Sequence, residues 1–315
     1  MLRFVARRLL QAVAVIFAAY TASFVILYLL PGDSVLSLYA GGDAGSAVDP
    51  AQLARIRAEY GFDQPLWEQF LHRLGHALTG DFGQSIKTGR DVSDLIGTAL
   101  PDTLALVGSA LLLAVALGGG LALLATMTRR GWLERFLLGL PAIGVSLPTF
   151  WVGLMLVQIF SFQLRLLPAI GNKGFESLVL PAITLALPGS AAVAQVLAKS
   201  LRRTLAEPYV VTARAMGTRP VVIQFRDALR NASLPALTVA GVLVANMVGG
   251  AIVVENVFSR AGLGQITVQA VLSHDIPVVQ GVVVLGAAIF AVVNLLIDLA
   301  YPLIDPRLLL AGGKA

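Results

Sequence analysis

Few residues of this 315-residue chain have types and spacing that could do chemistry. His72 and His76 lie four positions apart in HRLGH, which puts both imidazoles on one face of a helix, as in zinc proteases. Arg73 stands where such a protease has its catalytic glutamate, and a cation beside a bound metal is unfavourable. We therefore interpret the histidines as polar residues of a helix face and predict no metal site.

Other catalytic chemistry has less support. The chain has no GxxxxGK(S/T) motif, so we predict no P-loop and no cofactor bound by this chain itself. It has no cysteine, which excludes thiolate nucleophiles, thiolate metal sites and disulfides. We therefore predict that the chain is not an enzyme.

The most unusual segment is residues 207–231, EPYVVTARAMGTRPVVIQFRDALRN, which places four arginines in a hydrophobic chain. Glu207 and Pro208 can begin a short helix that Gly217 ends, and Arg219 with Pro220 can begin another. Its composition leaves two interpretations open: an interfacial helix with arginines on lipid phosphates, or a docking element for a soluble partner.

Long apolar stretches must position these residues. The chain is 57% hydrophobic and 13% charged, and six windows without Asp, Glu, Lys or Arg reach the roughly 20 residues that cross about 30 Å of hydrocarbon. The windows are residues 9–30, 104–127, 136–164, 178–197, 232–254 and 278–297. They are continuous rather than alternating, which predicts helices and not a barrel. We predict an all-α membrane protein with six transmembrane helices, the first being too long for a signal peptide.

Polar residues inside the windows indicate what the spans could transport. Glu255 and Asp298 lie near span ends, where we expect them to reach lipid headgroups. A charge at mid-span costs about 2.5–3.5 kcal/mol on an insertion scale and usually marks an ion relay. The absence of such charges disfavours an ion-coupled pump and an intramembrane hydrolase. The candidates for a translocation path are Gln158, Gln195, Asn246 and Asn294.

Small residues and prolines indicate close packing and bent helices. Two windows have small residues at four-residue spacing, which lets neighbouring backbones approach. They are Ala114, Gly118 and Ala122 in the second window and Gly241, Ala245 and Gly249 in the fifth. Two other windows have prolines seven residues apart, Pro141 with Pro148 and Pro181 with Pro188, and each should kink its helix.

The distribution of basic residues predicts the orientation. With Met1 inside, fifteen Lys and Arg fall on inner segments, whereas the short outer loops carry only Arg165, Lys173 and Arg260. Both termini and residues 198–231 are then cytoplasmic. The net charge of +5 is explained without a nucleic-acid partner.

The long outer loop, residues 31–100, is predicted to contain two short helices. Their boundary signals are Asp49, Pro50 and Gly61 for the first and Asp63, Pro65 and Gly80 for the second. The second helix has an apolar face that we expect to pack on the spans rather than lie in the lipid interface. That face consists of Leu66, Trp67, Phe70, Leu71, Leu74 and Leu78.

Short motifs occur in order along nearly the whole chain. They are LLPGD, YGFDQPLWEQFL, GDFGQSIKTGRDV, ALPDTL, LPTFWVGL, LRLLPAIG, YVVTARAMG, ALRNASLP, VFSRAGLGQ, DIPVVQG and LIDLAYPLIDPR. With these motifs the chain resembles the B-type permease subunits of peptide ABC importers, the oligopeptide and dipeptide type. The resemblance implies a type I importer permease core of five transmembrane helices. The expected organisation is an N-terminal helix at 1–30, the outer loop at 31–100, the core at 101–306 and a cytoplasmic tail at 307–315.

The resemblance also implies that residues 207–235 are the family's EAA-type loop, whose short helix sits in a cleft of an ATPase subunit. The expected coupling residues are Glu207, Tyr209, Thr212, Ala213, Arg214, Ala215 and Gly217. Val211, Met216 and Thr218 depart from the arginine, lysine and leucine usual in the family. The docking surface is therefore less basic than typical.

Four kinds of partner follow from the resemblance. They are membrane lipid, a homologous C-type permease in a heterodimer, two ATPase subunits that hold ATP and Mg²⁺, and an external solute-binding protein at a bacterial inner membrane. Peptides are the expected cargo, although the same pattern serves nickel, glutathione and some sugars. The alternatives are a secondary transporter, whose uptake would follow an ion gradient without ATP, and a scaffold, whose deletion would leave uptake unchanged.

Overall fold

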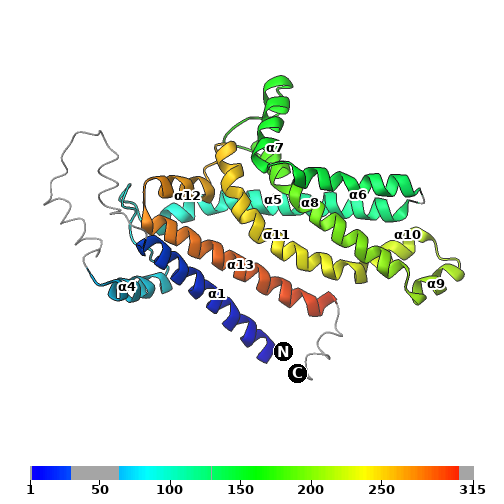
Figure 1. The fold of residues 1–315 in the computed structure, drawn as a ribbon, viewed down its shortest axis with the longest axis horizontal. Helices are drawn as coiled ribbons and strands as arrows, with labels where there is room; N and C mark the ends of the chain where they lie inside the picture. Colours follow the sequence, from blue (N-terminus) through cyan, green and yellow to red (C-terminus); the bar gives the residue numbers. More distant parts are fainter. Residues whose placement is uncertain (1, 30–63, 129, 305–315) are drawn as a thin grey trace.

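A computed structural model describes residues 2–29, 64–128 and 130–304, and the elements named in these ranges are helices (Figure 1). In chain order they are α1 (Leu2–Leu29), α4 (Leu66–Leu78), α5 (Val92–Met127), α6 (Gly131–Ser146), α7 (Thr149–Leu156), the π-helix η1 (Val157–Gln163), α8 (Glu176–Leu205), α9 (Pro208–Ala215), α10 (Pro220–Val222), the π-helix η2 (Ile223–Ala228), α11 (Leu229–Val257), α12 (Leu263–Leu272) and α13 (Ile276–Ile304). The prediction of an all-α chain is confirmed.

The described helices include five that are long and apolar enough to cross a membrane. These spans are Val5–Leu27, Val92–Met127, Glu176–Leu205, Pro220–Val257 and Ile276–Ile297. Helix α6 and the continuous helix formed by α7 and η1 are together long and apolar enough to cross a membrane, but they are bent by 99° relative to each other. Five spans and one bent pair thus correspond to the six predicted windows.

The bend replaces the kink that the sequence predicted at Pro148. Leu147 is extended, with φ −94° and ψ 135°, and Pro148 stands immediately before α7. A residue before proline avoids the α region, and proline has no amide hydrogen to donate to the preceding turn. The chain therefore breaks at Leu147 and Pro148, whereas α8 runs without a break through Pro181 and Pro188.

The first small-residue stripe forms the central helix contact, between α5 and α8. Ala114, Gly118 and Ala122 are all buried. A Cβ on Gly118 would lie 2.8 Å from Cβ of Val193 and would overlap the carbonyl oxygen of Ser190. Glycine is therefore what lets the two backbones approach.

The second stripe does not act as one packing face. A Cβ on Gly241 would lie 2.5 Å from Cδ1 of Ile297 on α13, so this position is a close contact. Gly249, two turns later, is exposed and would have nothing within 4 Å of a Cβ. The stripe therefore packs at one end and leaves small residues on an open surface at the other.

Helix α4 packs on α1 through one aromatic residue. The ring centroid of Phe70 lies 5.5 Å from that of Tyr20 and 5.2 Å from that of Phe24. Trp67 and Leu78, from the same predicted apolar face, remain 67% and 81% exposed. The expected packing on the spans therefore holds for Phe70 but not for the whole face.

Several sequence predictions fall outside the described residues. These are the first outer helix with Asp49, Pro50 and Gly61, the cap Asp63, most of the LLPGD motif and the tail 307–315. For the second outer helix the structure places Pro65 at the N-cap and Gly80, with φ +83°, just after the end.

Helices α8 and α11 run most of the length of the bundle and define its two ends (Figure 1). Helix α9 connects them at one end, which we call the α9 end. Helix α12 follows α11 at the opposite end, which we call the α12 end.

Candidate functional site

The segment between α8 and α11 folds as a short capped helix. Glu207 is extended at the N-cap of α9, and Pro208 occupies the first helical position. After the last turn Gly217 has φ +80°, and the amide of Thr218 donates to the carbonyl of Ala213 at 3.1 Å. A left-handed glycine after the C-cap ends the helix with little strain, as the sequence predicted.

Side-chain contacts hold α9 against the rest of the bundle. Val210 is completely buried. The Tyr209 hydroxyl donates to the carbonyl of Asp227 at 3.2 Å and accepts from Nδ2 of Asn231 at 3.1 Å. Gln224, on the next segment, donates to the carbonyl of Leu123 at 3.0 Å. Helix α9 is thus fastened to η2 and α11, and η2 in turn to α5.

The other side of α9 is open. Met216 is 75% and Val211 57% exposed, and Phe225 on η2 is 51% exposed. Among the predicted coupling residues Ala213 is half-buried, and the exposed ones are Glu207, Tyr209, Thr212, Arg214, Ala215 and Gly217. A fixed helix with an exposed apolar and basic face is suited to contact with another protein.

A second candidate site is a cavity of about 520 Å³ that α8 and α11 share with the α6–α7 bend. Gln195 from α8 and Asn246 from α11 both line it, with Thr149, Pro188 and Gly250 among the other lining residues. None of the residues that line it carries a charge. Two amide side chains on an otherwise mostly apolar wall can donate to and accept from peptide groups or other neutral polar groups.

The structure does not bring the other two polar candidates to this cavity. Gln158 is exposed on η1. Asn294 is half-buried on α13, where its Nδ2 donates to the carbonyl of Phe290 at 2.9 Å. The spacing along the sequence could not separate these two residues from Gln195 and Asn246.

The prediction that Glu255 reaches lipid headgroups is wrong, because its side chain is completely buried. Arg260, which the sequence placed among outer-loop charges, is only 3% exposed. The nearby Gly262 and Gly264 were the signal that could have indicated a close backbone wrap around a side chain. For Asp298 the side-chain position lies outside what the structure describes.

The histidines lie near a smaller cavity of about 360 Å³ beside α4. The rings of His72 and His76 are 4.7 Å apart, and Nδ1 of His76 lies 3.0 Å from Oδ2 of Asp81. Hydrogen bonds from the Gly83 amide and from His76 hold the pKa of Asp81 below its usual value. Across the described ranges, no group of three His, Cys, Asp or Glu could hold a metal ion.

Comparisons with known proteins cover nearly the whole length of the chain. Residues 98–310 match the family described as binding-protein-dependent transport system inner membrane component, and residues 1–107 match the N-terminal family of such membrane components. A protein of Sinorhizobium fredii named "Probable peptide ABC transporter permease protein" is 37% identical over 97% of this chain and 98% of its own length.

A glutathione transport system permease protein of Escherichia coli is 34% identical over 98% of this chain and 99% of its own length. Among solved structures, the inward-facing MetNI methionine ABC transporter aligns with a TM-score of 0.58 at 20% identity. The alignment covers 67% of this chain and 96% of that chain. This likeness concerns the fold.

Proposed function

Because the chain belongs to the binding-protein-dependent transport system inner membrane component family and is a permease subunit of an ABC importer, we propose that it forms half of a translocation path for di- or oligopeptides. The observation that carries this proposal is the uncharged cavity to which α8 contributes Gln195 and α11 contributes Asn246. Peptide groups are neutral and carry both donors and acceptors, which two amide side chains can match.

The exposed face of α9 supports a coupling role. Glu207, Tyr209, Thr212, Ala213, Arg214, Ala215 and Gly217 form or flank a helix that is fixed on one side and open on the other. An ATPase subunit that grips this helix can move the inner ends of α8 and α11 together. Met216 and Val211 then supply an apolar contact where the family has basic residues.

The proposed assembly follows from this role. The α9 end faces the cytoplasm, as do both termini, and two ATPase subunits hold ATP and Mg²⁺ there. A homologous C-type permease completes the path, and an external solute-binding protein delivers the cargo at the α12 end. Family membership places this chain in an ATP-driven importer rather than a secondary transporter.

The assembly is tested by purifying the full-length chain from its own cell in mild detergent and identifying the proteins that accompany it. Reconstitution of that complex in proteoliposomes should give ATP-dependent uptake of a labelled dipeptide when the binding protein is added. Uptake that follows an ion gradient without ATP would overturn the proposal. Uptake of glutathione or nickel instead of dipeptides would keep the permease role and replace the cargo.

The cavity is tested in the same preparation. Gln195→Leu and Asn246→Leu should each raise the KM for peptide uptake by about two- to tenfold, the value of one hydrogen bond. Gln158→Leu is the matched control, since Gln158 is exposed like Gln195 and Asn246 but does not line the cavity. Equal KM values for all three variants would remove the cavity from the substrate path.

A further inference from the structure

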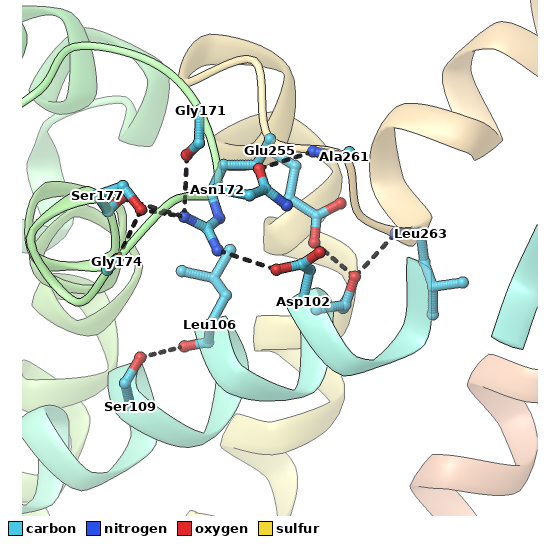
Figure 2. A network of polar contacts seen from close by, with 12 residues as sticks. Asp102, Leu106, Ser109, Gly171, Asn172, Gly174, Ser177, Glu255, Ala261 and Leu263 are labelled. Carbon is cyan, nitrogen blue, oxygen red and sulfur yellow. Dashed lines mark hydrogen bonds and ion pairs between the residues drawn. The ribbon is translucent and has the colours of Figure 1, made fainter. Parts of the chain in front are cut away.

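A cluster of buried polar groups lies at the α12 end, between the last turn of α11 and the first turn of α12 (Figure 2). Glu255 is completely buried and Arg260 is 3% exposed. Charged groups are rarely buried unless they are paired and hydrogen-bonded, because each loses its hydration.

The Glu255 carboxylate joins three helices. The hydroxyl of Thr103, on α5, donates to its Oε1 at 2.6 Å, and the amide of Gly264, on α12, donates to its Oε2 at 2.6 Å. The same Thr103 oxygen accepts from the amide of Leu263 at 2.8 Å. Both carboxylate oxygens of an α11 residue are thus engaged by α5 and α12.

Two glycines make this close wrap possible. The three atoms nearest to a Cβ built on Gly262 all belong to the Glu255 carboxyl group, which such a Cβ would overlap. A Cβ on Gly264 would lie 2.9 Å from Oε2 of Glu255 and would overlap Cα of Ile252. Neither position has a left-handed φ, so the requirement for glycine here is steric contact with α11.

Arg260 extends the cluster to the start of α8. Its Nη1 donates to the carbonyl of Ser177 at 3.1 Å and to that of Gly171 at 3.3 Å. Its Nη2 lies 3.6 Å from Oδ1 of Asp102 on α5. The amide of Ala261 also donates to Oδ1 of Asn172 at 3.0 Å. Residues 260–264 therefore bond to α5, to α11, to the start of α8 and to the segment before it (Figure 2).

We propose that Glu255 and Arg260 are positioning residues that fasten the α12 ends of α5, α8 and α11 into one rigid unit, so that a displacement at α9 reaches the outer mouth of the path. The inference rests on the proposed coupling role of α9. Helices α8 and α11 are joined through α9 at one end and through this cluster at the other, and both contribute to the cavity. Without the cluster, movement at α9 would splay the two helices instead of moving them together.

The test uses the complete transporter in proteoliposomes and measures three quantities: assembled complex, ATP hydrolysis and peptide transported per ATP. In Gly262→Ala and Glu255→Gln the complex should assemble and hydrolyse ATP, while peptide per ATP falls by about tenfold, within the range for residues of one hydrogen-bonded network. Gly249→Ala is the matched control, because Gly249 is exposed on the same helix as Glu255. It should keep the wild-type ratio.

Two results would overturn the inference. Wild-type peptide per ATP in both cluster variants would show that the cluster does not transmit movement, and loss of assembly in both would show a role in folding alone. Thr103→Val combined with Glu255→Gln should cause no more loss than one of them, since both act through one contact. If the α9 variant Arg214→Glu leaves transport unchanged, the proposed coupling function fails. If Arg214→Glu uncouples and the cluster variants do not, only this inference fails.

Discussion

The two ends of α8 and α11 differ in whether their charged side chains are exposed or buried. At the α9 end Arg214 is exposed, and the ion pair of Arg202 with Glu134 leaves the arginine side chain 51% exposed. At the α12 end Arg260 and Glu255 are buried, and several backbone and hydroxyl groups surround them. Exposed ion pairs contribute little to stability, whereas a buried polar group that loses its hydrogen-bond partner costs about 1–3 kcal/mol. The α9 end is therefore open to a partner, and the α12 end holds the helices together.

The largest effect is expected at the α12 end. Glu255→Ala leaves the buried Thr103 hydroxyl and Gly264 amide without their acceptor. At about 1–3 kcal/mol for each unsatisfied group, it should destabilise the chain by about 2–6 kcal/mol. Thermal unfolding in detergent measures this change. The matched control is Glu134→Ala, whose partner Arg202 is half-exposed, and it should change stability by about 1 kcal/mol or less. Equal losses in the two variants would contradict the distinction between the ends.

A smaller loss is expected midway between the ends, where α5 and α8 touch. Gly118→Ala should destabilise by about 1–3 kcal/mol, because its Cβ would meet backbone of α8. The control is Gly120→Ala on the same helix. A Cβ on Gly120 would have no atom within 4 Å, so this change should be neutral or slightly stabilising. The same unfolding assay checks both. A stable Gly118→Ala would mean that α5 and α8 can separate without cost.

At the α9 end we expect a change in coupling with little change in stability. Arg214→Glu reverses a charge on the exposed face of α9 and should leave the protein inserted while uptake no longer follows ATP hydrolysis. Gly217→Asp should act similarly, because a side chain at φ +80° strains the end of the helix. Lys199→Glu, exposed on α8, is the charge-reversal control. Unaltered uptake in both α9 variants would exclude a docking role for α9.

The smallest effect concerns Asp81, at the end of α4 and outside the spans. Its pKa is lowered by the Gly83 amide and His76, so it contributes stability above the ordinary carboxyl pKa of 3.8, and this contribution is lost as pH falls through the lowered value. The protection factors of residues 79–83, in which hydrogen-exchange rates are corrected for the intrinsic pH dependence of amide exchange, should therefore fall only in strong acid. Asp81→Asn should remove this acid dependence and leave the α12 cluster unaffected. Protection factors that still fall in acid in Asp81→Asn would contradict the assignment.

Much of the fold could be predicted from the sequence, because membrane spans depend on length and composition alone. The six windows correspond to five helices and a bent pair, and the α9 boundaries follow from Pro208 and Gly217. The bend at Leu147 and Pro148 was predicted only as a kink. Proline indicates that a helix is disturbed there, but neighbouring helices decide whether it bends, breaks or, as in α8, continues.

The candidate sites were less predictable. Polarity selected Gln195, Asn246, Gln158 and Asn294 equally, and only the packing of α8 beside α11 placed the first two in one cavity. The coupling function of α9 stays a prediction that its exposed face supports.

The sequence by itself determined that this chain crosses a membrane as helices and has a short capped helix between two spans, because hydrocarbon admits only internally bonded backbone and local caps set helix ends. Only the tertiary structure decided that Glu255 lies buried rather than among headgroups. Its partners Thr103 and Gly264 come from other helices, 152 residues before it and 9 after it in the chain. A buried charge depends on such distant groups, and no local pattern around Glu255 specifies them.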